Sequence, residues 1–183
     1  MPLILLEGLD GTGKSTLAEQ LSSAKGWPVV NIFEGEDKEY LESLGIKKET
    51  YHEDIYFMDN WISLGKPSCI LDRGIISGWV YSKSNTLHKV QSSEAMEYWM
   101  RRMEPFKKEI FIIFLDTHSE VIIERDEIWK GKEGQLSHDR NKFFSARHSF
   151  LRNGFQCQTF DTTFKSPDIT FKEVEQWLSK FNL

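Results

Sequence analysis

The segment Gly8–Ser15 constrains this chain more than any other. It reads G-L-D-G-T-G-K-S, follows the apolar run Pro2–Leu6 directly, and leads into a stretch with helical spacing of leucines. Glycines at these positions let successive backbone N–H groups point inward at phosphate oxygens, and the following helix adds the positive end of its dipole. Lys14 can reach the β- and γ-phosphates of a nucleotide, and the Ser15 hydroxyl can bind Mg²⁺. The residues expected to hold the triphosphate are Gly8, Gly11, Thr12, Gly13, Lys14, Ser15 and Thr16.

Short apolar runs alternate with helical segments along the rest of the chain. The runs are Pro2–Leu6, Trp27–Phe33, Ser68–Leu71, Glu109–Leu115 and Phe155–Phe160. Such runs are typical of strands buried on both faces, and their alternation with helices predicts a parallel sheet. We therefore expect an α/β protein with the three-layer P-loop NTPase fold: a five-stranded parallel sheet, helices on both faces and a short lid. Ligands in such sheets lie beyond the carboxyl ends of the strands.

Three Ser/Thr-x-x-Glu spacings predict where helices begin. They are Thr50–Glu53, Thr117–Glu120 and Thr170–Glu173. In this pattern the two side chains satisfy backbone N–H groups that the first helical turn leaves unpaired.

The composition indicates one domain over residues 1–183 with no membrane segment. The chain has 183 residues and two cysteines, Cys69 and Cys157, that form no CxxC motif and fit a reduced, cytoplasmic setting. Its apolar stretches are too short to span a bilayer, and its N-terminus lacks a basic, cleavable signal. A net charge of −5 disfavours a general nucleic-acid coat protein or a binder of anionic membranes. Anionic substrates would require positive charge concentrated at one site.

Other classes of P-loop protein fit the sequence less well than a kinase. A GTPase needs an NKxD segment, which is absent, and a separate DxxG, whereas Asp10–Gly13 lies inside the glycine-rich segment itself. A motor-type ATPase has a strand ending in Asp-Glu, but here Asp72 is followed by Arg73. In a kinase the carboxylate can hold Mg²⁺ through water while the guanidinium clamps an acceptor phosphate.

Four sequence segments, distributed over nearly the whole length of the chain, match the motifs of one protein family in order and placement. Glu7–Thr16 reads E-G-L-D-G-T-G-K-S-T, and Leu71–Tyr81 reads L-D-R-G-I-I-S-G-W-V-Y. The other two are Pro105–Leu115, which is followed by Arg125, and Asp139–Arg147. Together they resemble the thymidylate kinase family of nucleoside monophosphate kinases.

The resemblance implies roles for individual residues. Asp10 would receive the 3′-hydroxyl of the acceptor deoxyribose, Arg73 would clamp the acceptor phosphate, and Asp72 would be its partner on the magnesium side. Arg125, at the start of the lid, would reach ATP. The expected catalytic residues are Lys14, Arg73, Asp10 and Arg140, and the expected metal ligands are Ser15 and Asp72.

The expected lid covers about residues 129–140. Relatives without an arginine in the P-loop supply the cation for the transition state from the lid, and in this chain Gly11 follows Asp10. One such cation can be worth about 10³-fold in rate or more. The lid offers Lys130, Lys132 and Arg140, of which we favour Arg140.

The acceptor-binding region, about residues 34–66, departs from the family pattern. The family holds thymine with an aromatic side chain and an arginine; here Phe57 or Tyr56 supplies the aromatic ring, but Asn60 stands at the arginine position. An Asn amide both donates and accepts hydrogen bonds, whereas Arg only donates. The sequence therefore predicts an altered or relaxed base preference that includes a modified pyrimidine.

Two further features concern the acceptor side. Gly74 occupies a position that is usually aromatic in the family, and Trp79 and Tyr81 could wall the acceptor pocket. The residues expected to bind the acceptor are Asp10, Phe57, Asn60, Arg73, Trp79 and Tyr81.

The leading hypothesis is phosphoryl transfer, dependent on ATP and Mg²⁺, to the 5′-phosphate of dTMP or a related deoxynucleoside monophosphate. A kinase for an unphosphorylated hydroxyl, in a deoxynucleoside or in a modified base of DNA, is the alternative. A nucleotide-binding protein without transferase activity is a third interpretation. The expected partners are small molecules, with no membrane and no nucleic acid, and a homodimer is suggested by analogy with the family.

Overall fold

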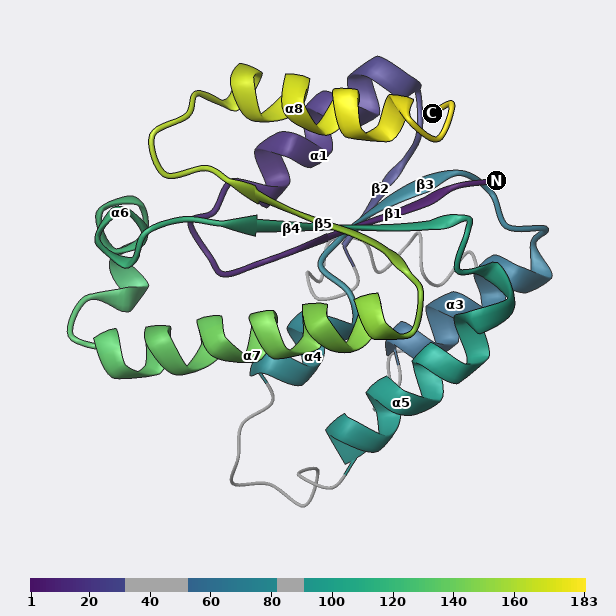
Figure 1. Cartoon of the computed structure of the whole chain (residues 1–183), viewed down its shortest axis with the longest axis horizontal. Coiled ribbons are helices and arrows are strands. Elements are labelled where there is room, and N and C mark those ends of the chain that lie inside the picture. The colour runs from purple at the N-terminus through teal and green to yellow at the C-terminus, as the bar shows by residue number, and fades with distance from the viewer. Residues whose placement is uncertain (32–52, 82–90) are drawn as a thin grey trace.

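The computed structural model describes residues 1–31, 53–81 and 91–183 (Figure 1). Its centre is a five-stranded, wholly parallel sheet with the strand order β2-β3-β1-β4-β5. The strands are β1 (Leu3–Glu7), β2 (Val29–Val30), β3 (Cys69–Asp72), β4 (Ile110–Asp116) and β5 (Gln156–Asp161). The sheet therefore confirms the predicted fold class. The second strand is shorter than the expected Trp27–Phe33, and Phe33 lies outside the described residues.

Helices cover both faces of the sheet (Figure 1). On one face lie α1 (Lys14–Lys25) and α8 (Pro167–Ser179). The helices on the other face are α3 (Glu53–Ser63), α4 (Ile75–Tyr81), α5 (Gln91–Met103) and α7 (Glu133–Arg152). The remaining helical segments are α6 (Ser119–Arg125), η2 (Glu104–Phe106) and η3 (Glu127–Trp129). No helix within the described ranges is long and apolar enough to cross a membrane.

The continuous apolar character of the strands follows from this layering. In β1, Leu3 and Leu5 pack into the core shared with α3, α4, α5 and α7, whereas Ile4 and Leu6 pack into the core shared with α1 and α8. Successive strand residues point to opposite faces, and each face of this sheet is covered. All four side chains are fully buried.

Two of the predicted helix starts are wrong. Helix α8 begins at Pro167, so Thr170 lies inside it rather than at its cap, because proline is well suited to the first helical turn. Helix α6 begins at Ser119 with His118 as its N-cap, and the Thr117 hydroxyl instead donates to Oγ1 of Thr163 at 3.2 Å. Thr50 lies outside the described residues.

Candidate active site

The glycine-rich segment joins the carboxyl end of β1 to α1, as predicted. Gly13 is the N-cap of α1 with φ of 93°, and Gly8 has φ of 146°. A Cβ atom on Gly8 would lie 2.3 Å from the carbonyl oxygen of Leu115 in β4. Glycine is therefore required there by close approach to a neighbouring strand as well as by backbone conformation.

Lys14 lies beneath this loop with a side chain that is almost fully buried. Its ammonium donates a hydrogen bond of 2.7 Å to the carbonyl oxygen of Leu9. Burial lowers the pKa of Lys14 to about 8. Three nearby carboxylates oppose that shift, those of Asp72, Glu7 and Asp126. An anionic ligand at this loop would favour the charged form of the lysine.

A cavity of about 300 Å³ opens beside the loop. It is lined by Gly13 and Thr16 on the P-loop side, by Arg125 from the end of α6, and by Lys165 from the segment before α8. The Arg125 guanidinium donates to the carbonyl oxygens of Thr162, at 3.1 Å, and of Thr163, at 3.3 Å. The structure thus brings Arg125 to the predicted triphosphate residues, in a cavity with room for the rest of a nucleotide.

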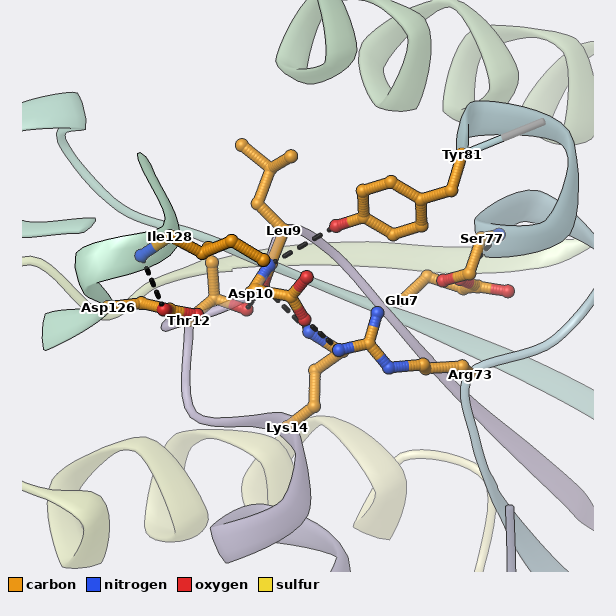
Figure 2. Close-up of polar contacts among 10 residues, drawn as sticks. All are labelled: Glu7, Leu9, Asp10, Thr12, Lys14, Arg73, Ser77, Tyr81, Asp126 and Ile128. Carbon is orange, nitrogen blue, oxygen red and sulfur yellow. Dashed lines mark hydrogen bonds and ion pairs between the residues drawn. The ribbon is translucent and has the colours of Figure 1, made fainter. Parts of the chain in front are cut away.

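Arg73, Asp10 and Tyr81 form a second cluster at the same edge of the sheet (Figure 2). Arg73 follows β3 with φ of 73°, a strained conformation for a residue other than glycine, and forms an ion pair with the Asp10 carboxylate. The Tyr81 hydroxyl accepts a hydrogen bond of 3.2 Å from the Asp10 N–H, and its ring lies 5.7 Å from the Arg73 guanidinium. Burial raises the pKa of Tyr81 to about 12, so this hydroxyl stays protonated. Three of the residues predicted from sequence therefore meet.

Asp72 and Ser15 suit a magnesium ion. The Oδ1 atom of Asp72 is buried and has no hydrogen-bond partner in the parts of the chain that the structure describes. Ser15 is exposed at the first turn of α1. Mg²⁺ prefers hard oxygen ligands and is usually held by one or two protein groups together with substrate phosphates and water. The described residues contain no cluster of three or more His, Cys, Asp or Glu that could hold a metal.

Arg140 lies on α7 beside the P-loop, and its guanidinium is paired with the carboxylate of Asp116. Its guanidinium makes a bidentate pair with Asp116, at 2.8 and 2.6 Å, and lies 5.5 Å from the Phe144 ring. Together with Gly8 and Leu9 it lines a cavity of about 20 Å³. Within the expected lid, residues 133–140 form the first turns of α7. The catalytic role of Arg140 stays a prediction.

The other residues expected on the acceptor side are less closely gathered. Phe57 is 3% exposed and packs in the core, while Asn60 is half-buried on the next turn of α3. Trp79 is half-buried on α4, with the Lys142 ammonium 5.9 Å from its ring. Residues 34–52 of the expected acceptor region lie outside the described residues, so the role of this region stays a prediction.

Packing accounts for one departure from the family pattern. A Cβ atom on Gly74 would lie 3.2 Å from Oε1 of Glu7 and 3.2 Å from Cδ2 of Leu71. Larger side chains at this position would therefore require Glu7 or Leu71 to move. Glu7 had no predicted role of its own, although a charged residue at the end of a wholly apolar strand indicates one.

The fold and this geometry can be compared with known proteins. No family model matches the chain. Over 139 residues it is 27% identical to the deoxyguanosine kinase of Bacillus subtilis, a match that covers 69% of this chain and 66% of that enzyme. The structure of the YorR protein of B. subtilis in complex with phosphorylated GDP has a TM-score of 0.68 at 19% identity, covering 97% of this chain and 95% of that one. Thymidylate kinase of Candida albicans has a TM-score of 0.61 at 19% identity, covering 98% and 91%.

This chain has the P-loop kinase fold. The structural similarity to the two solved structures extends over almost the whole length of this chain. The sequence match to deoxyguanosine kinase covers just under two thirds of the length of that enzyme. The 300 Å³ cavity and the cluster around Arg73 both adjoin the P-loop, the cavity at Gly11, Thr12 and Gly13 and the cluster at Asp10.

Proposed function

We propose that this chain is a kinase, dependent on ATP and Mg²⁺, that transfers a γ-phosphoryl group to the 5′-phosphate of a deoxynucleoside monophosphate. The observation that carries the proposal is the position of Arg73. Its guanidinium follows the carboxyl end of β3 and pairs with the P-loop residue Asp10 (Figure 2). The cavity that Arg125 lines adjoins Gly11, Thr12 and Gly13 of the same loop. A cation at that place suits an acceptor that carries a phosphate of its own.

The donor would occupy the P-loop and the adjoining cavity. Backbone N–H groups from Gly11 to Lys14 and the start of α1 favour the β- and γ-phosphates, and Arg125 and Lys165 border the space left for the ribose and base. Mg²⁺, held through Ser15 and Asp72, would neutralise charge on the transferring group. The protein's own task is then to position the two phosphates in line and to supply positive charge.

The acceptor would bind against Arg73 and Asp10. Both side chains are partly exposed, at 21% and 27%, so a phosphate and a sugar hydroxyl can reach them. An acceptor phosphate would share the Arg73 guanidinium with Asp10 or displace it. The Asp10 carboxylate would then accept a hydrogen bond from the 3′-hydroxyl of the sugar, and the protonated Tyr81 hydroxyl would lie beside it.

For the base we propose an altered or relaxed preference that includes a modified pyrimidine, read in part by Asn60 on α3. Competition among the four common deoxynucleoside monophosphates tests this. Use of several acceptors supports a relaxed preference, and exclusive use of thymidylate contradicts it.

A second candidate is a kinase for deoxynucleosides themselves. The match to deoxyguanosine kinase favours it. The two functions differ in their products, because a monophosphate acceptor gives a diphosphate and a nucleoside acceptor gives a monophosphate.

Replacing Arg73 tests the proposed function. A charge-assisted contact to phosphate contributes about 1.5 to 3 kcal/mol, so Arg73→Ala should raise the acceptor KM about 10- to 100-fold with a small change in the KM for ATP. The exposed Arg101 of α5 provides the control, since Arg101→Ala removes the same charge away from the site. Equal kinetics in the two variants would contradict the assignment.

A further inference from the structure

Glu7 is a fully buried carboxylate that the proposed chemistry does not use. It is the last residue of β1, directly before the P-loop, and its side chain has no exposed surface. Carboxylates are almost never fully buried unless they are paired or hydrogen-bonded. Its partners therefore indicate why it is there.

Within the described residues, the hydrogen bonds of the Glu7 carboxylate go to the segment that follows Arg73. Oε1 accepts from the backbone N–H of Gly74 at 3.0 Å and of Ile76 at 3.3 Å. Oε2 accepts from the backbone N–H of Ser77 at 3.0 Å and from its hydroxyl at 2.5 Å. The Glu7 carboxylate, which belongs to β1, thus caps the beginning of α4 (Figure 2).

Hydrogen bonds to β1 hold the backbone both at Arg73 and at the residue that follows it. The Arg73 N–H donates to the carbonyl oxygen of Leu6 at 3.1 Å, and the next N–H in the chain, that of Gly74, donates to Glu7. Arg73 has a left-handed conformation with φ of 73°, which persists only where the surroundings hold it. The neighbouring residues Leu6 and Glu7 of β1 supply that restraint.

We infer that Glu7 is a positioning residue that holds Arg73 where the acceptor phosphate binds. The inference rests on the proposed function, because it gives Glu7 a purpose only if Arg73 meets an acceptor. Glu7 would then link both halves of the site. Its backbone leads into the P-loop, where ATP would bind, and its carboxylate fixes the segment after Arg73, where the acceptor would bind.

Stability alone accounts poorly for a charge at this position. Burial raises the pKa of Glu7 to about 7, which shows that its environment disfavours the ionised form in spite of four hydrogen bonds and the nearby Lys14. Apolar residues of similar size often stabilise a protein when they replace buried charges. The role that we assign to Glu7 therefore rests on its four hydrogen bonds to the segment after Arg73.

The test compares Glu7→Ala, Glu7→Gln, Arg73→Ala and the double variant Glu7→Ala/Arg73→Ala. Steady-state kinetics give separate KM values for ATP and for a deoxynucleoside monophosphate. Misplacement of a binding group by about 1 Å can cost about 10²-fold, so Glu7→Ala should lower kcat/KM for the acceptor by about that factor, mainly through KM. The KM for ATP should change less than about threefold. Glu7→Gln keeps one carbonyl oxygen and should give a smaller loss.

The double variant separates positioning from general damage. If Glu7 acts through Arg73, removing it from an enzyme that already lacks the Arg73 guanidinium should change the acceptor KM less than about threefold. The matched control is Glu109→Gln. Glu109 is another hydrogen-bonded carboxylate, bound to Lys66, but it precedes β4 at the opposite end of the sheet. The Glu109→Gln substitution should leave the KM for ATP and the KM for the acceptor unchanged.

Three outcomes would overturn the inference: equal losses for ATP and acceptor, additive effects in the double variant, or native acceptor kinetics in Glu7→Ala. If Glu7→Ala does not fold, as judged by circular dichroism, the isosteric Glu7→Gln carries the same comparison. Failure of the proposed function gives a different result, because the wild-type enzyme would then form no diphosphate or Arg73→Ala would leave the acceptor KM unchanged.

Discussion

Binding of ATP should take up a proton at Lys14 at alkaline pH. Burial lowers the pKa of this lysine to about 8 from its ordinary 10.5, so the free protein loses the ammonium charge as the pH rises through 8. A triphosphate against the side chain favours the charged form and returns the pKa toward its ordinary value. The charge that Lys14 offers to ATP is therefore almost fully present at pH 7, half lost at pH 8, and largely restored by protonation on binding at pH 9.

The magnitude follows from the two pKa values. With Lys14 at about 8 in the free protein and at 10.5 or above in the complex, uptake from this group is about 0.1 proton at pH 7, about 0.5 at pH 8 and about 0.9 at pH 9. The same linkage makes the Kd for ATP about tenfold weaker at pH 9 than at pH 7, or about 1.4 kcal/mol. Burial raises the pKa of Glu7, which faces Lys14, to about 7, so this carboxylate is ionised at pH 9 and contributes little uptake there.

Titration calorimetry measures this uptake directly. ATP is titrated at each pH in buffers of different ionisation enthalpy, and the slope of the observed enthalpy against that quantity gives the protons bound. Lys14→Met is the control and should show almost no uptake at pH 9. Uptake below about 0.3 proton in the wild-type protein at pH 9, or the same uptake in Lys14→Met, would refute the placement of Lys14 against the triphosphate.

Four substitutions give further expectations. Lys14→Met should lower turnover by about 10³-fold or more with unchanged circular dichroism, because positive charge on the transferring group is lost; near-native rates would contradict the site. Asp72→Asn should raise the Mg²⁺ concentration for half-maximal activity about tenfold or more, measured by metal titration, since a neutral amide binds the ion less well. Arg125→Ala should weaken ATP binding about tenfold in calorimetry while the acceptor KM stays unchanged. Arg140→Lys cannot make the bidentate pair with Asp116, so urea unfolding should show a loss of about 1 kcal/mol.

Local patterns predicted the fold and the position of the glycine-rich loop. The apolar run that ends at Glu7 and the glycine-rich segment after it determine a strand, a phosphate loop and a helix within Leu3–Lys25. The neighbouring pair Asp72 and Arg73 was found because it ends a buried strand, and parallel strands bring their carboxyl ends to one edge. In each case the residues that matter are close in sequence, and the spacing itself carries the chemistry.

Contacts between distant segments could not be read from the sequence. The structure pairs Arg140 with Asp116, which lies 24 residues earlier on another element, and the local sequence around Arg140 does not indicate this partner. Glu7 bonds to Ser77 at a separation of 70 residues, and nothing in either local pattern identifies the partner. Such contacts depend on how α4 and α7 pack on the sheet, which no local periodicity specifies.

The most direct test of the account is the identity of the labelled product. ATP carrying radioactive phosphorus in the γ-position is incubated with the protein, Mg²⁺ and each deoxynucleoside monophosphate in turn, and in parallel with each deoxynucleoside. The account predicts that label enters a deoxynucleoside diphosphate, at its β-phosphate, and that Arg73→Ala suppresses this transfer. Label found only in a deoxynucleoside monophosphate, or only in inorganic phosphate, would contradict it.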